Sequence, residues 1–355
     1  MKKEITIALD AMGGDHAPDS VVGGAALASR RLTSVRFVLF GDRSRISPLL
    51  ERHSKLLPVS EIIHTTEAVS NDEKPSQALR KGAQSSMRLA IDSVKNDEAQ
   101  GVVSAGNTGA LMAMSKVVLK TQSDIDRPAM ISYFPTMRGE SALLDLGANL
   151  ECDSRNLVEF AIMGSGFARS ILGIERPTVG LLNVGIEDVK GNEVIRKAGQ
   201  ILRESDFGFE FHGFVEGNDI GQGKVDVFVT DGFTGNAVLK TTEGTAVLIT
   251  SFLKSSFKRS WMSRLGYLLA KPALDDLKDK LDPRQYNGAL FLGLNGVVVK
   301  SHGSTDAEGF ASAISVAVDM IKGDFNERIH TDLERLQPAL EAKILSEQQL
   351  DDVEQ

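Results

Sequence analysis

Three segments rich in glycine and small polar residues have the composition of anion-binding loops. They span residues 10–18, 104–109 and 230–236, and each follows a short apolar run. The second and third also begin helical patterns, so backbone N–H groups at a helix start could bind an anion such as phosphate. Tight strand-to-helix turns have the same composition, but several such loops at the carboxyl ends of strands on one edge of a sheet favour a phosphate-binding surface.

Three side chains other than the glycines have groups that could take part in chemistry. His16 lies in the first glycine-rich loop, where a ring nitrogen could bind phosphate or move a proton, although a structural hydrogen bond fits equally well. Lys190 follows an apolar run and precedes a helical pattern, where a solvated surface lysine is the default interpretation. Cys152, the single cysteine, has no histidine nearby in the sequence and is interpreted as structural.

The sequence lacks the common nucleotide-binding, metal-binding and hydrolase motifs. Gly164-Ser165-Gly166 lies inside a helical pattern rather than after a strand, and Asn218 stands where a P-loop needs its first glycine. The six histidines show no metal-ligand spacing, and no G-x-S-x-G elbow occurs. The sequence therefore predicts no metal site, no cofactor and no serine-hydrolase triad.

The elements that must position these loops alternate between strands and helices. Short apolar runs predict buried strands at residues 5–9, 35–40, 59–64, 101–103, 131–134, 142–146, 178–182, 207–215, 225–229 and 297–300. The stretches between them, such as 154–172, place apolar residues at helical spacing. This alternation predicts a mostly parallel sheet with helices on both faces, in one continuous α/β body over residues 1–325.

Composition and charge argue against several classes of protein. The net charge is −8, and basic residues are interspersed with acidic ones, so nucleic-acid binding is not expected. One cysteine permits no intramolecular disulfide, and no apolar run is long enough to span a bilayer. Without a recognisable signal peptide, these features predict a cytoplasmic protein.

Two regions depart from the alternating pattern. Residues 241–282 form a long helical stretch, which we expect to be a hairpin broken near Pro272 that serves dimer contact, membrane-surface binding or both. Its candidate membrane-contacting residues are Phe257, Trp261, Leu265 and Leu268. Residues 326–355 are polar and acidic and predict a surface helix or tail.

A series of motifs occurs in a fixed order along the chain. They are Asp10-Ala11-Met12-Gly13-Gly14-Asp15-His16-Ala17-Pro18, Ser104-Ala105-Gly106-Asn107-Thr108-Gly109-Ala110, Arg127-Pro128-Ala129, Asp145-Leu146-Gly147-Ala148-Asn149, Lys190-Gly191-Asn192-Glu193, Phe214-Val215-Glu216-Gly217, Thr230-Asp231-Gly232-Phe233-Thr234-Gly235-Asn236 and Lys300-Ser301-His302-Gly303. Together they resemble the ordered motifs of the bacterial phosphate acyltransferases (the PlsX family). The likeness covers nearly the whole chain.

The resemblance implies a three-layer α/β/α fold similar to the isocitrate and isopropylmalate dehydrogenases and to the phosphotransacetylases. It implies that acyl-[acyl carrier protein] and inorganic phosphate are converted to acyl phosphate and free acyl carrier protein, for phosphatidic acid synthesis. It also implies a homodimer, peripheral association with the membrane, and a downstream membrane acyltransferase that consumes the product.

This reaction needs no covalent enzyme intermediate, because phosphate is already an oxyanion and a thiolate is a fair leaving group. The enzyme must hold two reactants in line and stabilise a tetrahedral oxyanion. We hypothesise that helix-start amides near Asn107 and Thr108 act with Lys190 on the phosphate or the developing charge. Asn236 and Asp231 would orient the reacting groups, and His16 would bind phosphate or protonate the departing sulfur. The other candidate phosphate- and substrate-binding residues are Asp10, Gly13, Gly14, Asp15, Ser104, Gly106, Gly109, Asn149, Gly232 and Thr234.

Other functions remain open from the sequence. A phosphotransacetylase acting on short acyl-coenzyme A needs the same phosphate site. A nicotinamide-dependent hydroxy-acid dehydrogenase of the same fold is disfavoured because no metal-binding carboxylate cluster is evident. A membrane-surface scaffold for lipid synthesis would have little use for glycine-rich loops at strand ends.

Overall fold

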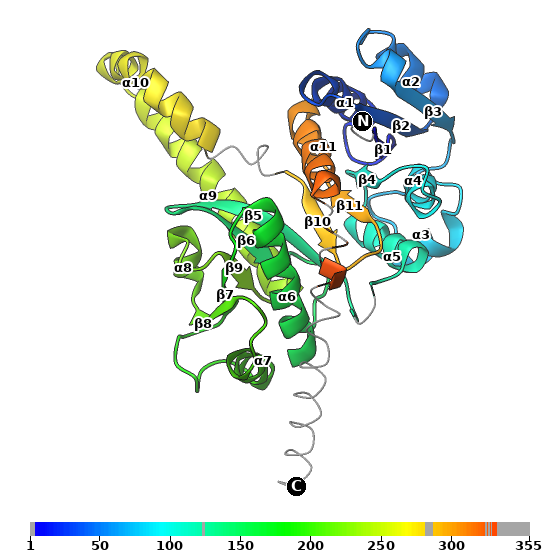
Figure 1. Cartoon of the computed structure of the whole chain (residues 1–355). Helices are drawn as coiled ribbons and strands as arrows, with labels where there is room; N and C mark the ends of the chain where they lie inside the picture. The colour runs from blue at the N-terminus through cyan, green and yellow to red at the C-terminus, as the bar shows by residue number, and fades with distance from the viewer. Residues whose placement is uncertain are drawn as a thin grey trace.

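One mixed sheet of eleven strands runs through the middle of the molecule (Figure 1). The structure is a computed structural model that describes residues 4–122, 125–280, 287–323, 325, 327 and 329–331. In spatial order the strands are β3-β2-β1-β4-β11-β10-β5-β6-β9-β7-β8. Their bounds are β1 Ile5–Asp10, β2 Val35–Gly41, β3 Ser60–His64, β4 Gly101–Ser104, β5 Ala129–Thr136, β6 Gly139–Leu144, β7 Thr178–Leu182, β8 Glu210–Val215, β9 Val227–Val229, β10 Ala289–Leu292 and β11 Val297–Lys300.

Helices connect these strands and cover both faces of the sheet. They are α1 Asp19–Arg31, α2 Arg43–Leu50, α3 Pro75–Lys81, α4 Ser86–Lys95, α5 Thr108–Leu119, α6 Ser154–Ile171, α7 Glu193–Glu204, α8 Gly217–Gln222, α9 Gly232–Lys258, α10 Trp261–Lys280 and α11 Ala307–Lys322. Apolar residues of α1, α6, α7 and α11 form one hydrophobic cluster against the sheet. Those of α4, α5, α8 and the start of α9 join a second cluster on the opposite face. The predicted three-layer α/β/α architecture is therefore confirmed.

The strands change direction at the centre of the sheet. β10 is antiparallel to both β11 and β5, and β5 is antiparallel to β6. The other strand pairs of the described chain are parallel. The parallel strands on the two sides of this centre consequently run in opposite directions. The expectation that all the glycine-rich loops leave one edge of the sheet is wrong for this reason.

The predicted strands are all present, within a few residues at their ends. Strand β10 was not predicted from the sequence, because it is a run of only four residues that shares its apolar character with the following β11. Helix 154–172 is confirmed as α6. The prediction for residues 326–355 falls almost entirely outside the described residues.

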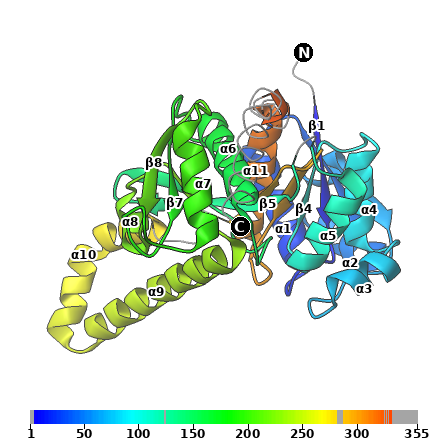
Figure 2. The same ribbon diagram turned by 90° about the horizontal axis from the view of Figure 1, so that it is seen from below.

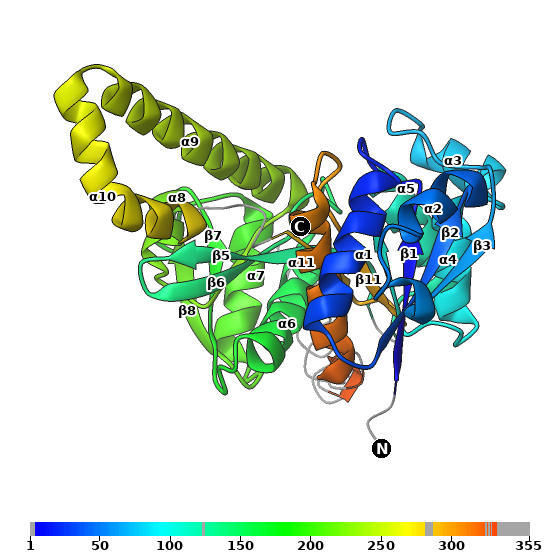
Figure 3. The same ribbon diagram turned by 90° about the horizontal axis from the view of Figure 1, so that it is seen from above.

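A helical hairpin projects from the body, as Figures 2 and 3 show. Its bounds differ from the prediction, because α9 starts at Gly232 and the chain reverses between α9 and α10. Pro272 lies within α10 and does not break it. The reversal occurs where the Ser260 hydroxyl accepts a hydrogen bond from the backbone N–H of Ser263 at 3.1 Å, which caps the start of α10. Among the described helices, none combines the length and the hydropathy that a bilayer-spanning segment requires.

Candidate active site

A pocket of about 640 Å³, which we name the central pocket, lies over the antiparallel strands on the face covered by α5 and α9. Met130 and Ser132 of β5 line it, and residues two apart on a strand point to the same face. Thr108 at the start of α5 lines one side, and a stripe of α9 that begins at Asn236 lines the other. The pocket therefore lies between the two halves of the sheet.

The lining of the central pocket combines apolar and polar side chains. Met130, Leu146, Leu239 and Val247 supply apolar surface, whereas residues 300–306 supply hydroxyl groups, an imidazole and an ammonium group. Ligand pockets are commonly apolar with a few convergent polar groups that fix orientation. This pocket suits a ligand that has a hydrocarbon part and an anionic part.

The carboxylate of Asp10, at the end of β1, is fully buried in a polar cluster. It accepts hydrogen bonds from the hydroxyl groups of Ser86 at 2.6 Å and Ser104 at 2.7 Å. Burial raises the pKa of Asp10, although the two hydroxyls act in the opposite direction. A Cβ on Gly13 would collide with this carboxylate, and one on Gly106 would lie 3.3 Å from it. These residues fix the loops that follow β1 and β4.

The rest of the first glycine-rich loop reaches the surface. Gly14 has a φ of +101°, which residues with a side chain rarely adopt. The Asp15 carboxylate accepts a hydrogen bond from Asn71 at 2.8 Å, and its backbone N–H donates to the Gly303 carbonyl at 2.8 Å. The loop is thereby tied to the segment after β11. His16 is exposed and is outside the lining of the central pocket.

Helix α5 begins beside the pocket with a capping asparagine. The side-chain oxygen of Asn107 accepts a backbone N–H of the first turn at 3.0 Å, and its amide nitrogen donates to the carbonyls of Asn71 at 2.9 Å and Glu73 at 2.8 Å. The Asn107 side chain is therefore committed to the fold. The N–H groups of Thr108 and Gly109, at the positive end of the helix, have no acceptor within the helix.

Helix α9 places Asn236 in the central pocket. The Asp231 carboxylate caps the helix by accepting bonds from the backbone N–H and the hydroxyl of Thr234, both at 2.8 Å. This cap fixes the first turn, and Asn236 follows on it beside Gly147. Asp231 and Thr234 thus position Asn236, while Asn236 itself lines the pocket.

The loop after β6 packs against the first turn of α9. Its Asp145 carboxylate accepts bonds from the backbone N–H of Asn149 at 2.6 Å, the amide of the same side chain at 2.9 Å and the N–H of Met130 at 2.9 Å. Burial raises the pKa of Asp145. The Gly232 N–H donates to the Asn149 carbonyl at 2.7 Å, and a Cβ on Gly235 would collide with the Asp145 carbonyl. Glycine is required for this close approach.

Lys300, the last residue of β11, belongs to the last of the ordered motifs, but no role was predicted for it from the sequence. Its side chain lines the central pocket, although the residue is only 8% exposed. The ammonium group donates to the carbonyls of Ala105, at 3.4 Å, and Ser301. Burial lowers the pKa of Lys300 to about 8, and the nearby Asp10 acts in the opposite direction. A charged residue ending an otherwise apolar strand was the signal in the sequence.

Two further basic side chains lie on the wall of the central pocket. Lys240 Nζ is 3.2 Å from His302 Nε2 and forms an ion pair with Glu243 at 2.9 Å. The imidazole Nδ1 is 3.0 Å from the Ser304 hydroxyl. Burial and, to a lesser degree, the Lys240 charge lower the pKa of His302.

A second pocket, of about 230 Å³, lies at the carboxyl ends of β7 and β9. Cys152 and Asp231 are among its lining residues, and burial raises the pKa of Cys152 to about 12, which keeps the thiol protonated. Lys190 is exposed on the loop between β7 and α7 and lines neither pocket. The Asn183 amide donates to the Lys190 carbonyl at 3.2 Å and holds this loop closed. The structure therefore brings Thr108 and Asn236 into one pocket but leaves Lys190 outside it.

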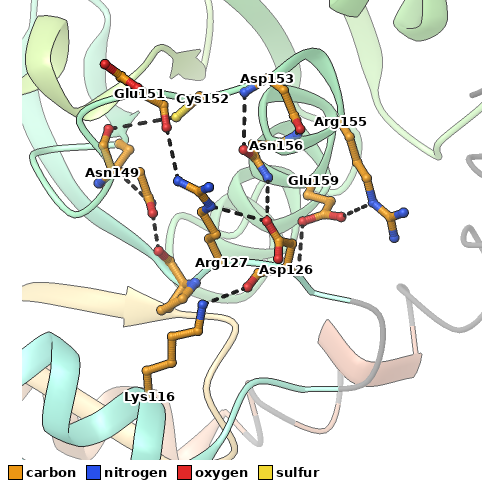
Figure 4. A network of polar contacts seen from close by, with 12 residues as sticks. Lys116, Asp126, Arg127, Asn149, Glu151, Cys152, Asp153, Arg155, Asn156 and Glu159 are labelled. Atoms are coloured by element: carbon orange, nitrogen blue, oxygen red, sulfur yellow. Dashed lines mark hydrogen bonds and ion pairs between the residues drawn. The ribbon is translucent and has the colours of Figure 1, made fainter.

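A network of polar contacts holds the segment between β6 and α6, as Figure 4 shows. The Asn149 amide donates to the Pro128 carbonyl at 2.8 Å, and Arg127 donates to the Glu151 carbonyl at 3.3 Å. The Asp153 carboxylate caps α6. Asn149 is thus a buried structural residue that fixes the loop beneath α9.

Comparison with known proteins gives the family and the fold. A family model described as "Fatty acid synthesis protein" matches residues 5–328. The chain is 60% identical to a phosphate acyltransferase of Rhodospirillum centenum over 346 residues, which is 98% of each chain. It is 56% identical to a phosphate acyltransferase of Paramagnetospirillum magneticum over 96% of this chain and 97% of the relative.

Two solved structures share the fold at low sequence identity. A phosphotransacetylase from Streptococcus pyogenes has a TM-score of 0.60 at 16% identity, covering 91% of this chain and 95% of its own. The EutD phosphotransacetylase of Staphylococcus aureus has a TM-score of 0.58, also at 16% identity, covering 90% of this chain and 94% of its own. The predicted likeness to the phosphotransacetylase fold is confirmed.

Proposed function

Because this chain belongs to the fatty acid synthesis protein family, in which its relatives are phosphate acyltransferases, we propose that it transfers a fatty acyl group from acyl carrier protein to inorganic phosphate. The products are acyl phosphate and free acyl carrier protein. A membrane acyltransferase of phosphatidic acid synthesis would consume the acyl phosphate. The observation that carries this proposal is the central pocket, which joins an apolar wall to hydrogen-bond donors at the start of α5 and on α9.

In the proposed reaction, an oxygen of phosphate attacks the thioester carbonyl carbon. The carbonyl oxygen becomes an oxyanion in the tetrahedral intermediate, a carbon–oxygen bond has formed, and the carbon–sulfur bond then breaks. The carbonyl double bond re-forms as sulfur leaves with the electron pair as a thiolate. The thiolate takes up one proton from solvent and hydrogenphosphate gives one up, so the protons balance. The enzyme accelerates these steps by holding the reactants in line and by placing donors where charge develops.

The groups for these tasks lie on the two sides of the central pocket. We assign the N–H groups at the start of α5, near Thr108, to the phosphate, because the positive end of a helix favours an anion there. The Asn236 amide is assigned to the reacting carbonyl. The cap formed by Asp231 and Thr234 would hold Asn236 in position. Lys190 and His16 stay predictions from the sequence, since neither lines the pocket.

Trapping of the product tests this function. The full chain is incubated with palmitoyl acyl carrier protein and phosphate, and hydroxylamine converts any acyl phosphate to a hydroxamate. We expect hydroxamate that depends on phosphate and on enzyme. Acetyl-coenzyme A serves as the alternative donor. Product from acetyl-coenzyme A but not from the carrier protein would replace this proposal with a phosphotransacetylase activity.

We propose that the α9–α10 hairpin carries contacts with a second copy of the chain and with a membrane surface. Trp261 is 74% exposed and Leu268 69%, and Leu265 is also exposed. Phe257 instead packs edge-on against Tyr267 with ring centroids 5.4 Å apart, so it stabilises the hairpin. Exposed aromatic and aliphatic side chains flanked by basic residues favour an anionic lipid surface.

Vesicle flotation separates the two roles of the hairpin. The variant carrying Trp261→Glu and Leu265→Glu is compared with the wild type on vesicles containing anionic lipid. We expect the variant to lose binding while sedimentation still shows a dimer. Unchanged flotation would reject membrane contact through these side chains, and a monomeric wild type would reject the dimer.

A further inference from the structure

Lys300 is a buried cation without a carboxylate partner among the described residues. Lys224 and Lys240 each lie within 3.1 Å of a carboxylate oxygen, whereas the Lys300 ammonium contacts only the carbonyl oxygens of Ala105 and Ser301. A buried charge is costly unless it is paired or hydrogen-bonded. An aliphatic side chain would fill this space equally well. A cation at this position therefore indicates a role other than packing.

The alternation of β11 directs Lys300 toward the central pocket. Val297 and Val299 belong to the hydrophobic cluster on one face of the sheet, and Val298 belongs to the cluster on the other. Residues two apart on a strand share a face, so Lys300 points to the same face as Val298. That is the face on which α5 and α9 leave the central pocket open, and Lys300 lines it.

Hydrogen-bond donors gather around the ammonium group. The Asn287 amide donates to the hydroxyl oxygens of Ser301 at 2.9 Å and Thr305 at 3.0 Å. In the part of the chain that the structure describes, the Ser301 hydroxyl hydrogen has no acceptor, so it can donate to a ligand. Thr108, at the positive end of α5, lines the same pocket. The Ser301 hydroxyl and the N–H groups at the start of α5 are thus the donors left for an oxyanion, while the Asn287 amide holds Ser301 and Thr305 in place.

We propose that the Lys300 ammonium group binds the inorganic phosphate substrate in the central pocket, with the Ser301 hydroxyl and the start of α5 as its partners. This inference rests on the proposed function and names the residue that holds the attacking oxyanion. The charges that act on Lys300 are those of Asp10, Asp15 and Lys240, and the other titratable groups that line the central pocket with it are His302, Glu243 and Asp306. Lys240 is already paired with Glu243, which leaves Lys300 as the cation available to phosphate.

Direct binding tests the proposal without turnover. Equilibrium dialysis with radiolabelled phosphate is carried out on the wild type, Lys300→Met, Lys300→Arg and, as a matched control, Lys116→Met. Lys116 also donates to a backbone carbonyl, that of Asp126 at 3.1 Å, but lies outside the pocket lining. We expect Lys300→Met to weaken phosphate binding at least tenfold and Lys300→Arg to retain most of it. The control should match the wild type.

Kinetics separates a role in binding phosphate from a structural role. The KM for phosphate should rise at least tenfold in Lys300→Met, while the KM for the acyl donor stays unchanged. An effect on the KM for the acyl donor alone would place the phosphate of its prosthetic group at Lys300 and would overturn the assignment. Equal phosphate affinity in folded Lys300→Met would overturn it as well.

A pH series covers the case in which Lys300→Met does not fold. Phosphate affinity of the wild type should fall above pH 8 as the ammonium group loses its proton, whereas Lys300→Arg should keep its affinity to pH 9.5. Identical pH profiles would count against Lys300. A wild type that binds phosphate through Lys300 but yields no hydroxamate would refute the proposed function and leave the binding site standing.

Discussion

Because the ammonium group of Lys300 is buried, the free energy of unfolding should depend on pH by an amount that can be worked out. The pKa of this group is about 8 in the folded protein, against 10.5 for an unperturbed lysine. Between these values the unfolded chain keeps a proton that the folded chain has released, so the free energy of unfolding rises with pH. The rise is about 1.4 kcal/mol per pH unit, or roughly 2 kcal/mol between pH 8 and 9.5. Well below pH 8 both states are protonated, and this contribution is constant.

The comparison with Lys300→Met isolates this contribution, because other titrating groups affect both proteins alike. Free energies of unfolding from urea titrations at pH 7, 8, 8.75 and 9.5 are subtracted between the two proteins. The wild type should gain about 2 kcal/mol relative to the variant across the upper three values and only a few tenths of a kcal/mol, roughly, between pH 7 and 8. Lys116→Met should follow the wild type throughout. A constant difference between wild type and Lys300→Met would refute the claim that Lys300 is buried as a destabilised cation.

Three further predictions address the site. Asn236→Ala and, from the sequence hypothesis, Lys190→Ala should each lower turnover about a hundredfold or more, since one electrostatic donor contributes about 2.7–4 kcal/mol to lowering the barrier; near-normal hydroxamate formation by folded protein removes that residue from the site. Gly235→Ala should destabilise the protein by about 1–3 kcal/mol through collision with the Asp145 carbonyl, whereas Gly244→Ala on an open part of α9 should be neutral or stabilising in the same urea titrations. Because the pKa of His302 is lowered in the folded protein, the unfolded chain takes up the imidazole proton first as the pH falls below 6.5, and the protein becomes less stable. The melting temperature should therefore fall with acidification by a smaller amount in His302→Gln than in the wild type. Equal decreases in the two proteins would contradict this prediction.

The sequence predicted most strands and the layered architecture, because buried strands and amphipathic helices follow local apolar spacing. It did not predict the reversal at β10 and β5, since strand direction depends on how distant segments pair. Because of that reversal, the central pocket lies over a face of the sheet and not at one edge of it. The hairpin turn was assigned to Pro272, but the cap at Ser260 sets it.

The candidate site was predicted only in part, because it too depends on contacts between segments that are distant in the sequence. Thr108 and Asn236 were chosen from glycine-rich loops, and both line the central pocket. Other candidate side chains hold loops and helix starts instead of facing a ligand, as in Asn107, Asp231 and Asn149. Residue type alone does not distinguish this structural role from ligand binding. The contact between Lys300 and Ala105 joins residues far apart in sequence, so no local spacing reveals it.

Phosphate is expected to bind in the central pocket, between α5 and α9. Crystals of the full chain soaked in arsenate, an anomalously scattering analogue of phosphate, would locate the anion. We expect an anomalous peak within hydrogen-bonding distance of Lys300 Nζ, near Thr108 and Asn236. A peak beside Lys190 or in the pocket lined by Cys152, with the central pocket empty, would contradict it.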